Sequence, residues 1–198
     1  MKQVAYFHPA LRILHWFMAA AIVAMLFIGI AMVSTISSKH ALLGAIHKPL
    51  GLMILVLVVV RLWLRFYTSV PSLPASIPAW QRLIAHLSHW ALYLMMFLQP
   101  LIGWAMQSAA GYPITLGGGV VLPPIVPVNN DWFAILRPLH SLVALMLFAT
   151  VMLHLAAALF HALVLRDGVF DSMAGAGRAG GGKGHAGRGF GFSPLAFF

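Results

Sequence analysis

Four long apolar stretches dominate the chain and predict helices that cross a membrane. The first, residues 16–33, holds 18 residues without a charged or strongly polar side chain, and the last, residues 139–165, is uncharged over 27. Two more run over about 42–64 and 83–106. About 20 apolar residues cross the ~30 Å hydrocarbon core of a bilayer. The pattern therefore predicts an all-α membrane protein, a bundle of four transmembrane helices at about 10–34, 42–66, 82–107 and 137–166.

Proline and glycine mark the segments between these helices. The link over 67–81 contains three prolines, and the long connection over 107–136 combines prolines with a run of glycines. Loops of this length are usually functional or disordered, and the apolar character of 107–136 favours a segment that caps the bundle. From Ser172 onwards the chain is rich in glycine. We therefore expect one membrane domain over 1–171 and a flexible tail over 172–198.

The distribution of Lys and Arg predicts the orientation in the membrane. If the N-terminus lies inside, nine of the 12 basic residues fall on the cytoplasmic side, and Lys39, Lys48 and Arg137 fall on the outer side. Cytoplasmic loops carry the excess of positive charge in membrane proteins. We expect both termini to be cytoplasmic.

The composition excludes several classes of function. Only 8% of the residues are charged and 62% are hydrophobic, which nearly excludes a soluble domain. Three acidic residues leave little for carboxylate-based hydrolysis, and the absence of cysteine excludes disulfides, iron–sulfur clusters and covalently attached haem. The net charge of +9 sits mostly at helix ends, where anionic lipid rather than nucleic acid is the expected partner.

Histidine is the abundant functional side chain, with ten copies. On the last predicted helix, His140 and His154 are 14 residues apart. This spacing returns to within ~40° of the same helix face and separates the two by ~21 Å along the axis. In the predicted topology His47 shares the outer depth with His140, and His15 shares the inner depth with His154.

Two facing histidines at one depth are the arrangement that binds haem iron through two imidazoles. The pairs therefore predict two haems, with His15 and His154 as axial ligands inside and His47 and His140 outside. Three basic side chains near the bilayer edges are candidates for contacts with haem propionates: Arg12, Lys48 and Arg137. Two small residues beside His47 would make room for the porphyrin: Gly44 and Gly51.

Other interpretations of the histidines remain. A single histidine in an apolar helix is more often hydrogen-bonded to a neighbouring helix than bound to a metal. Zinc needs three or four ligands at one point, whereas this pattern offers two separate pairs. A proton relay would lack acidic partners in the spans, and a haem-free transporter or structural subunit would leave the pairing unexplained.

Several segments carry a family resemblance: LRILHWFMAA (11–20), AIHKPLGLMILVLVVVRL (45–62), QRLIAHLSHWALYLMMFLQPLIGW (81–104), GYPITLGG (111–118) and RPLHSLVALMLFATVMLHLAAALFHALVLRDGVF (137–170). Over roughly 6–171 the chain resembles the prokaryotic cytochrome b561 family. The resemblance implies a multi-pass protein of the bacterial cytoplasmic (inner) membrane that carries electrons between quinone and another carrier through two non-covalent haems b. Carried onto this sequence, it implies the same ligand pairs.

The resemblance also suggests substrates and partners. His89 and His161 at the inner end could bind ubiquinone or another quinone and exchange protons with it, or they could support the ligands or face lipid headgroups. Two versions of the function follow. One is a quinone-linked carrier with a periplasmic or membrane redox partner protein. The other resembles the superoxide oxidase branch of the family, which passes electrons from superoxide to ubiquinone.

Overall fold

Four long helices that alternate in direction form the protein. The computed structural model describes residues 6–68, 71, 77–116 and 119–175. The long helices are α1 (Pro9–Ser34), α2 (Lys39–Tyr67), α3 (Ala79–Ala109) and α4 (Asn130–Phe160). Across the described ranges the only extended pairing is an isolated bridge between Thr115 and Val121. The prediction of an all-α fold is confirmed.

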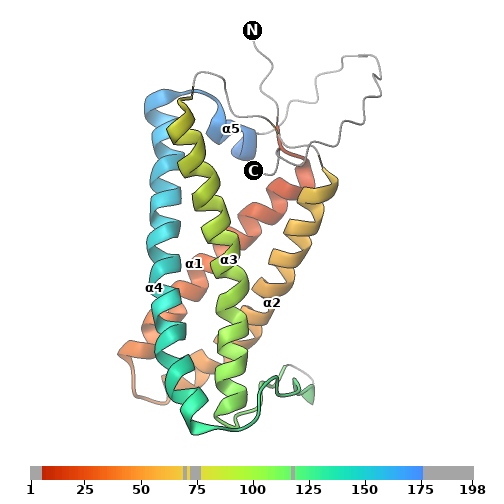
Figure 1. Ribbon diagram of the computed structural model, residues 1–198, viewed down its shortest axis with the longest axis vertical. Coiled ribbons are helices and arrows are strands. Elements are labelled where there is room, and N and C mark those ends of the chain that lie inside the picture. The colour runs from red at the N-terminus through yellow and green to blue at the C-terminus, as the bar shows by residue number, and fades with distance from the viewer. Residues whose placement is uncertain (1–5, 69–70, 72–76, 117–118, 176–198) are drawn as a thin grey trace.

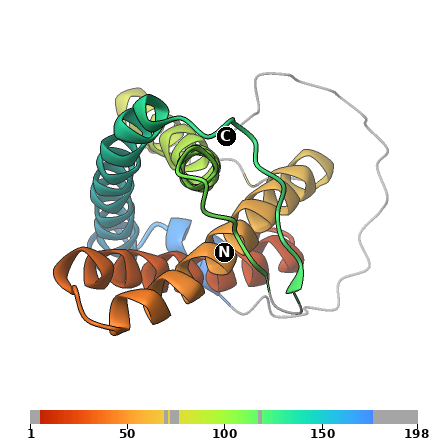
Figure 2. The ribbon, with the colours of Figure 1, turned by 90° about the horizontal axis from the view of Figure 1, so that it is seen from below.

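The alternation gives the bundle two distinct ends (Figure 1). The upper end in Figure 1 holds the starts of α1 and α3, the ends of α2 and α4, the π-helix η2 (His161–Leu165) and the short α5 (Val169–Ala174). The lower end holds the α1–α2 turn and the connection from α3 to α4. Seen along the bundle in Figure 2, α1 packs beside α2, and α3 beside α4, while α2 also contacts α3.

Polar caps determine where two of the helices begin. The His8 side chain accepts a hydrogen bond from the Ala10 N–H at 3.3 Å, and Pro9 occupies the first turn of α1, where proline is well tolerated. The Asn129 side chain accepts from the N–H groups of Asp131 and Trp132 at 2.8 and 3.0 Å. The helix therefore begins earlier than the expected start near 137, because the Asn129 cap lies ten residues, almost three turns, before the uncharged stretch.

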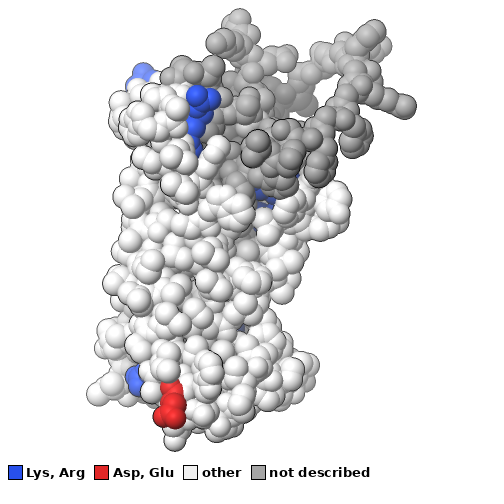
Figure 3. All heavy atoms as spheres, viewed as in Figure 1, with Lys and Arg blue, Asp and Glu red and all other residues white. Residues whose placement is uncertain are grey.

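The sides of the bundle suit a lipid environment. By length and composition, three segments could cross a membrane: Pro9–Ser34, Lys39–Tyr67 and Asn130–Leu165. The third long helix, α3, has 31 residues and runs the full length of α4, and its polar side chains include Ser88, His89 and Gln99. Many large apolar side chains are exposed along all four helices. In Figure 3, Lys, Arg and Asp gather towards the two ends, and the long side between them is almost free of charge.

The core is an apolar layer at mid-height. One cluster joins α1 and α2 and consists of Met18, Ala21, Ile22, Ile54 and Val58. A second cluster joins α3 and α4 and consists of Leu92, Met95 and Leu147. Met96 and Val151 pack against both clusters and connect them. This layer separates the polar side chains of the upper half from those of the lower half.

The segment after α4 folds back onto the start of α1. The Phe7 N–H donates to the Ser172 carbonyl at 3.1 Å, and the Arg12 Nε–H and Trp16 Nε1–H donate to the Met173 carbonyl at 3.2 and 3.4 Å. The tail expected over 172–198 thus begins inside α5, and its residues 176–198 lie outside the described part of the chain.

Candidate functional site

Three histidines meet in the upper half of the bundle, and we call them the upper level: His15 on α1, His89 on α3 and His154 on α4. The His15 and His154 rings have centroids 6.3 Å apart with planes at 77°. The His89 ring lies 5.4 Å from the His154 ring at 66°. The structure therefore brings the expected inner pair together and adds His89 as a third imidazole.

Two histidines meet in the lower half, and we call them the lower level: His47 on α2 and His140 on α4. Their ring centroids lie 6.2 Å apart with planes at 70°. The Nδ1 atoms of both rings are buried and have no hydrogen-bond partner. The expected outer pair is thus also brought together, with almost the same separation as His15 and His154.

Gln99 on α3 contacts both the backbone and the ring of His140. Its Nε2 donates to the His140 backbone carbonyl at 2.9 Å and lies 3.2 Å from the ring Nε2 of the same residue. The Gln99 Oε1 is buried without a partner. Gln99 is the polar residue in the apolar stretch of α3 that the sequence reasoning did not consider.

A glycine lets the His140 ring lie directly against α3. A Cβ atom at Gly103 would sit 3.1 Å from His140 Cε1, closer than side chains normally approach. Across the level, a Cβ at Gly29 would lie 3.9 Å from His47 Cε1. Gly44 and Gly51, which the sequence suggested as room for a porphyrin, face instead the methyl groups of Met32 and Met25.

The spacing of both pairs fits a metal held between two imidazoles. An imidazole nitrogen binds a metal at about 2.0–2.1 Å and lies about 1.1 Å from its ring centre, so opposed ligands have centroids about 6 Å apart. Both observed separations, 6.3 and 6.2 Å, agree with this value. Within the described ranges, no group of three or more His, Cys, Asp or Glu is arranged to hold a bare metal ion. The donor set therefore fits a cofactor that brings its own equatorial ligands, as haem does.

A buried arginine borders the upper level. Arg61 on α2 is 9% exposed, and its Nη1 donates to the Leu11 carbonyl at 3.0 Å. Its Nε donates to the Tyr93 hydroxyl at 3.1 Å. In the sequence, Arg61 is one of the nine basic residues expected on the cytoplasmic side. Its position within an apolar helix was the available signal for a functional role.

The cations expected to contact propionates have mixed surroundings. Arg12 is partly buried, donates to the Met173 carbonyl and lies over the Tyr6 ring, 5.6 Å from its centroid. Lys48 is half-buried beside His47, and Arg137 is exposed near the start of α4. Arg12 and Lys48 thus lie at the ends of the bundle near the two levels, while Arg137 faces outward.

The two expected quinone-binding histidines have separate environments. His89 belongs to the upper level, but His161 opens the π-helix, where its Nδ1 pairs with Asp167 Oδ2 at 2.6 Å. The other oxygen of that carboxylate accepts from the Val169 N–H at 3.1 Å. π-Helical turns frequently occur at functional sites. His161 is therefore held by an acidic partner rather than stacked beside His154.

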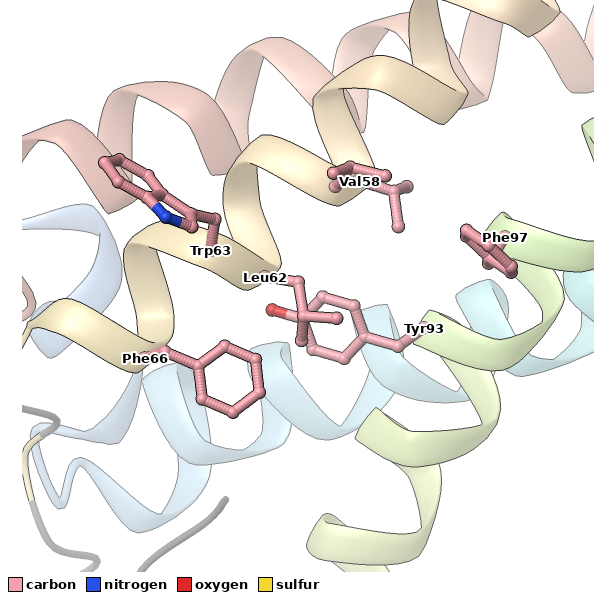
Figure 4. A pocket seen from close by; sticks show the side chains of 7 residues that line it. Val58, Leu62, Trp63, Phe66, Tyr93 and Phe97 are labelled. Carbon is pink, nitrogen blue, oxygen red and sulfur yellow. The ribbon is translucent and has the colours of Figure 1, made fainter.

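A groove between α2 and α3 opens on the upper half of the bundle (Figure 4). Its volume is about 270 Å³, and it is lined by Val58, Val59, Leu62, Trp63, Phe66, Tyr93 and Phe97. The lining is almost wholly apolar and includes neither His89 nor His161. The groove therefore suits a hydrocarbon chain better than a polar head group.

An all-helical membrane bundle with paired histidines at two heights has the architecture of a membrane-bound cytochrome b. A family model described as prokaryotic cytochrome b561 matches residues 6–176. The chain belongs to the prokaryotic cytochrome b561 family. It is thus a membrane electron-transfer protein of a family that carries b-type haem, and its place is the bacterial inner membrane.

Three curated relatives support the assignment. "Cytochrome b561 homolog 1" of Escherichia coli K12 is 31% identical over 131 residues, which cover 66% of this chain and 74% of the relative. "Probable superoxide oxidase CybB" of Yersinia pestis is 34% identical over 123 residues, 62% of this chain and 69% of the relative. "Cytochrome b561 homolog 2" of Escherichia coli K12 is 26% identical over 163 residues, 81% of this chain and 87% of the relative.

Proposed function

We propose that this protein carries electrons across the inner membrane through two b-type haems, one at each histidine level. His15 and His154 hold the upper haem, and His47 and His140 hold the lower one. The observation that carries this proposal is the matched spacing of the two pairs, 6.3 and 6.2 Å between ring centroids. The pairs come from different helices, so only the folded bundle creates them.

The proposal includes the topology. We take α3 as the fourth span, because its 31 residues run alongside α4 over the whole height of the bundle. We place the upper end in the cytoplasm, with both termini inside, because that end holds five of the eight Lys and Arg in the described part of the chain. The upper level is then the inner haem site and the lower level the outer one.

The chain's own residues bind and orient the cofactors and exclude water. Haem b supplies the one-electron redox chemistry when it is bound. Histidines on separate helices fix the two sites at different heights, and the apolar layer around Met96 and Val151 fills the space between them. The close packing at Gly103 and the Gln99 hydrogen bonds restrict the motion of the His140 ring.

The quinone pool is the proposed partner at the inner end, with ubiquinone as the representative substrate. His161 has a chemical arrangement suited to proton exchange, since Asp167 accepts from its Nδ1 and leaves Nε2 to bond a quinone oxygen. His89 is the second candidate, because it adjoins His154. Quinone reduction assayed on Asp167→Asn tests this part: an unchanged rate and KM would contradict a role for the pair.

Superoxide is a second candidate electron donor, favoured by the 34% identity to the Yersinia pestis relative named as a superoxide oxidase. The proposed outer end carries Lys39, Lys48 and Arg137 against the single acid Asp131, a modest attraction for an anion. The test is stopped-flow mixing of the oxidised protein with superoxide in the presence of quinone. Failure of the haem to become reduced within milliseconds would exclude this donor.

The decisive experiment for the proposed function is a count of haems. The protein is purified in detergent, its dithionite-reduced minus oxidised spectrum is recorded, and a pyridine haemochrome assay gives haem per chain. We expect two b-type haems. One haem would show that one histidine level has another role, and no haem in a folded sample would contradict the proposal.

A further inference from the structure

Arg61 is a cation without an anionic partner inside the bundle. It is 9% exposed. The sequence contains three acidic residues, Asp131, Asp167 and Asp171, and the only ion pair among the described residues joins Asp167 to His161. A buried charge without a counter-charge is strongly unfavourable in a protein interior and is a mark of function in a membrane span.

Neutral acceptors fix the position of Arg61 without balancing its charge. Nη1 donates to the carbonyl of Leu11 in the first turns of α1, and Nε donates to the hydroxyl of Tyr93 on α3. A guanidinium has five N–H donors in a rigid planar fork. The two bonds thus orient the group and leave further donors for a ligand.

The charge of Arg61 is directed at the upper level. Its hydroxyl partner Tyr93 lies four residues, about one helical turn, after His89 on α3. Leu11, its backbone acceptor, lies one helical turn before His15 and therefore on the side towards the upper end. The guanidinium thus borders the upper histidines where an acidic substituent of a bound group would reach towards the membrane surface.

We propose that Arg61 binds the carboxylate of a haem propionate at the upper level and raises the reduction potential of that haem. This inference rests on the proposed function. Arginine matches carboxylates in geometry and is the usual cation for buried pairs. A nearby positive charge in a medium of low dielectric constant stabilises the reduced haem, which carries one more electron, and so raises the reduction potential. No comparable cation is buried at the lower level among the described residues.

The test compares three variants of the full-length protein by spectroelectrochemical titration and haem count. Arg61→Gln removes the charge and keeps hydrogen-bonding groups, whereas Arg61→Lys keeps the charge. Arg82→Gln removes an equal charge from an exposed position at the start of α3 and controls for net charge. Repeating the titrations with His140→Ala, which keeps the upper pair, assigns each potential to a level.

We expect Arg61→Gln to lower the equilibrium constant for reduction of the upper haem at least tenfold, which lowers its reduction potential by about 59 mV for one electron. Loss of the upper haem alone would also agree with the inference. Arg61→Lys should keep the upper haem with a potential near the wild-type value, and Arg82→Gln should change nothing. Upper-haem potentials equal in Arg61→Gln and Arg82→Gln, with both haems present, would overturn the inference. Loss of both haems from Arg61→Gln and Arg61→Lys alike would also overturn it, since that marks a purely structural role. A wild type without haem would contradict the proposed function itself.

Discussion

The upper and lower histidine levels share one geometry but differ in their surroundings. The ring separations differ by 0.1 Å, from 6.3 to 6.2 Å, and each pair is formed with a histidine of α4. The upper pair is bordered by a third imidazole, His89, and by the buried cation Arg61. The lower pair is bordered by the neutral amide of Gln99 and by Gly103.

Under the proposed function, this contrast would give two haems with the same kind of ligand pair different electrostatic surroundings. The potential of a haem depends on the axial ligands, but also on burial, hydrogen bonds and nearby charge. With histidines at both levels, the ligand type cannot distinguish the sites. We therefore expect any difference in potential to come from Arg61 and His89 above and from Gln99 below, and the following variants test this in order of expected effect.

The largest effect should come from removing the α4 histidine of one level. His154→Ala should lower the haem content from two per chain to one by emptying the upper site, and His140→Ala should do the same at the lower site. Because the apolar layer separates the levels, the remaining haem should keep its own spectrum and potential. The measurement is the haemochrome count with a redox titration. Equal loss of both haems from either variant would contradict two independent sites.

The next largest effect should come from removing the other histidine of each pair, and it should differ between His15 on α1 and His47 on α2. His89 lies 5.4 Å from His154 in ring centroids and is available as a replacement ligand, whereas the lower level has no third imidazole among the described residues. His15→Ala should therefore retain a measurable fraction of the upper haem, and His47→Ala should lose the lower haem completely. The double variant His15→Ala, His89→Ala is the control and should lose the upper haem. Identical losses of haem from His15→Ala and His47→Ala would show that His89 does not act as a replacement ligand.

The histidine levels could be predicted from sequence because helical periodicity and span length place side chains by depth and face. The residues that distinguish the levels could not be predicted in this way. Arg61, Gln99 and Gly103 matter through contacts with other helices, and these depend on how the four helices cross. Even so, a charge or an amide inside an apolar stretch was a visible signal at two of these positions.

Local irregularity explains a second group of differences. In an ideal α-helix His161, seven residues after His154, would lie on nearly the same face, but the chain enters a π-helix at His161 and turns at Arg166 with a φ of 50°. The imidazole pairs with Asp167 as a result. Asn129 likewise begins α4 before the uncharged stretch, because a cap depends on hydrogen bonds rather than on hydropathy.

A smaller effect is expected from filling the space beside His140. Gly103→Ala would place a Cβ 3.1 Å from Cε1 and 3.4 Å from Nδ1 of the ring, so the ring must shift by a few tenths of an ångström. We expect a loss of about 1–3 kcal/mol in stability and a changed low-temperature spectrum of the lower haem only. Gly51→Ala is the matched control, because its Cβ would meet the flexible Met25 methyl at 3.6 Å. Thermal unfolding followed by haem absorbance measures both, and equal behaviour of the two variants would contradict the close packing at Gly103.

The smallest effect should come from Gln99→Leu, which removes the two side-chain hydrogen bonds from Gln99 to His140, the only ones that the described residues show between α3 and α4 at the lower level. Hydrogen bonds between helices in membranes contribute roughly 0.6–2 kcal/mol, so the midpoint of unfolding should fall by a few degrees. The lower haem should shift in potential, because the ring of His140 loses its neighbouring amide, while the upper haem stays unchanged. Thr150→Val is the control, since its hydroxyl donates within α4 to the Met146 carbonyl at 2.8 Å. A shift of both haems in Gln99→Leu would show that the two levels are coupled and that their difference does not arise from local contacts.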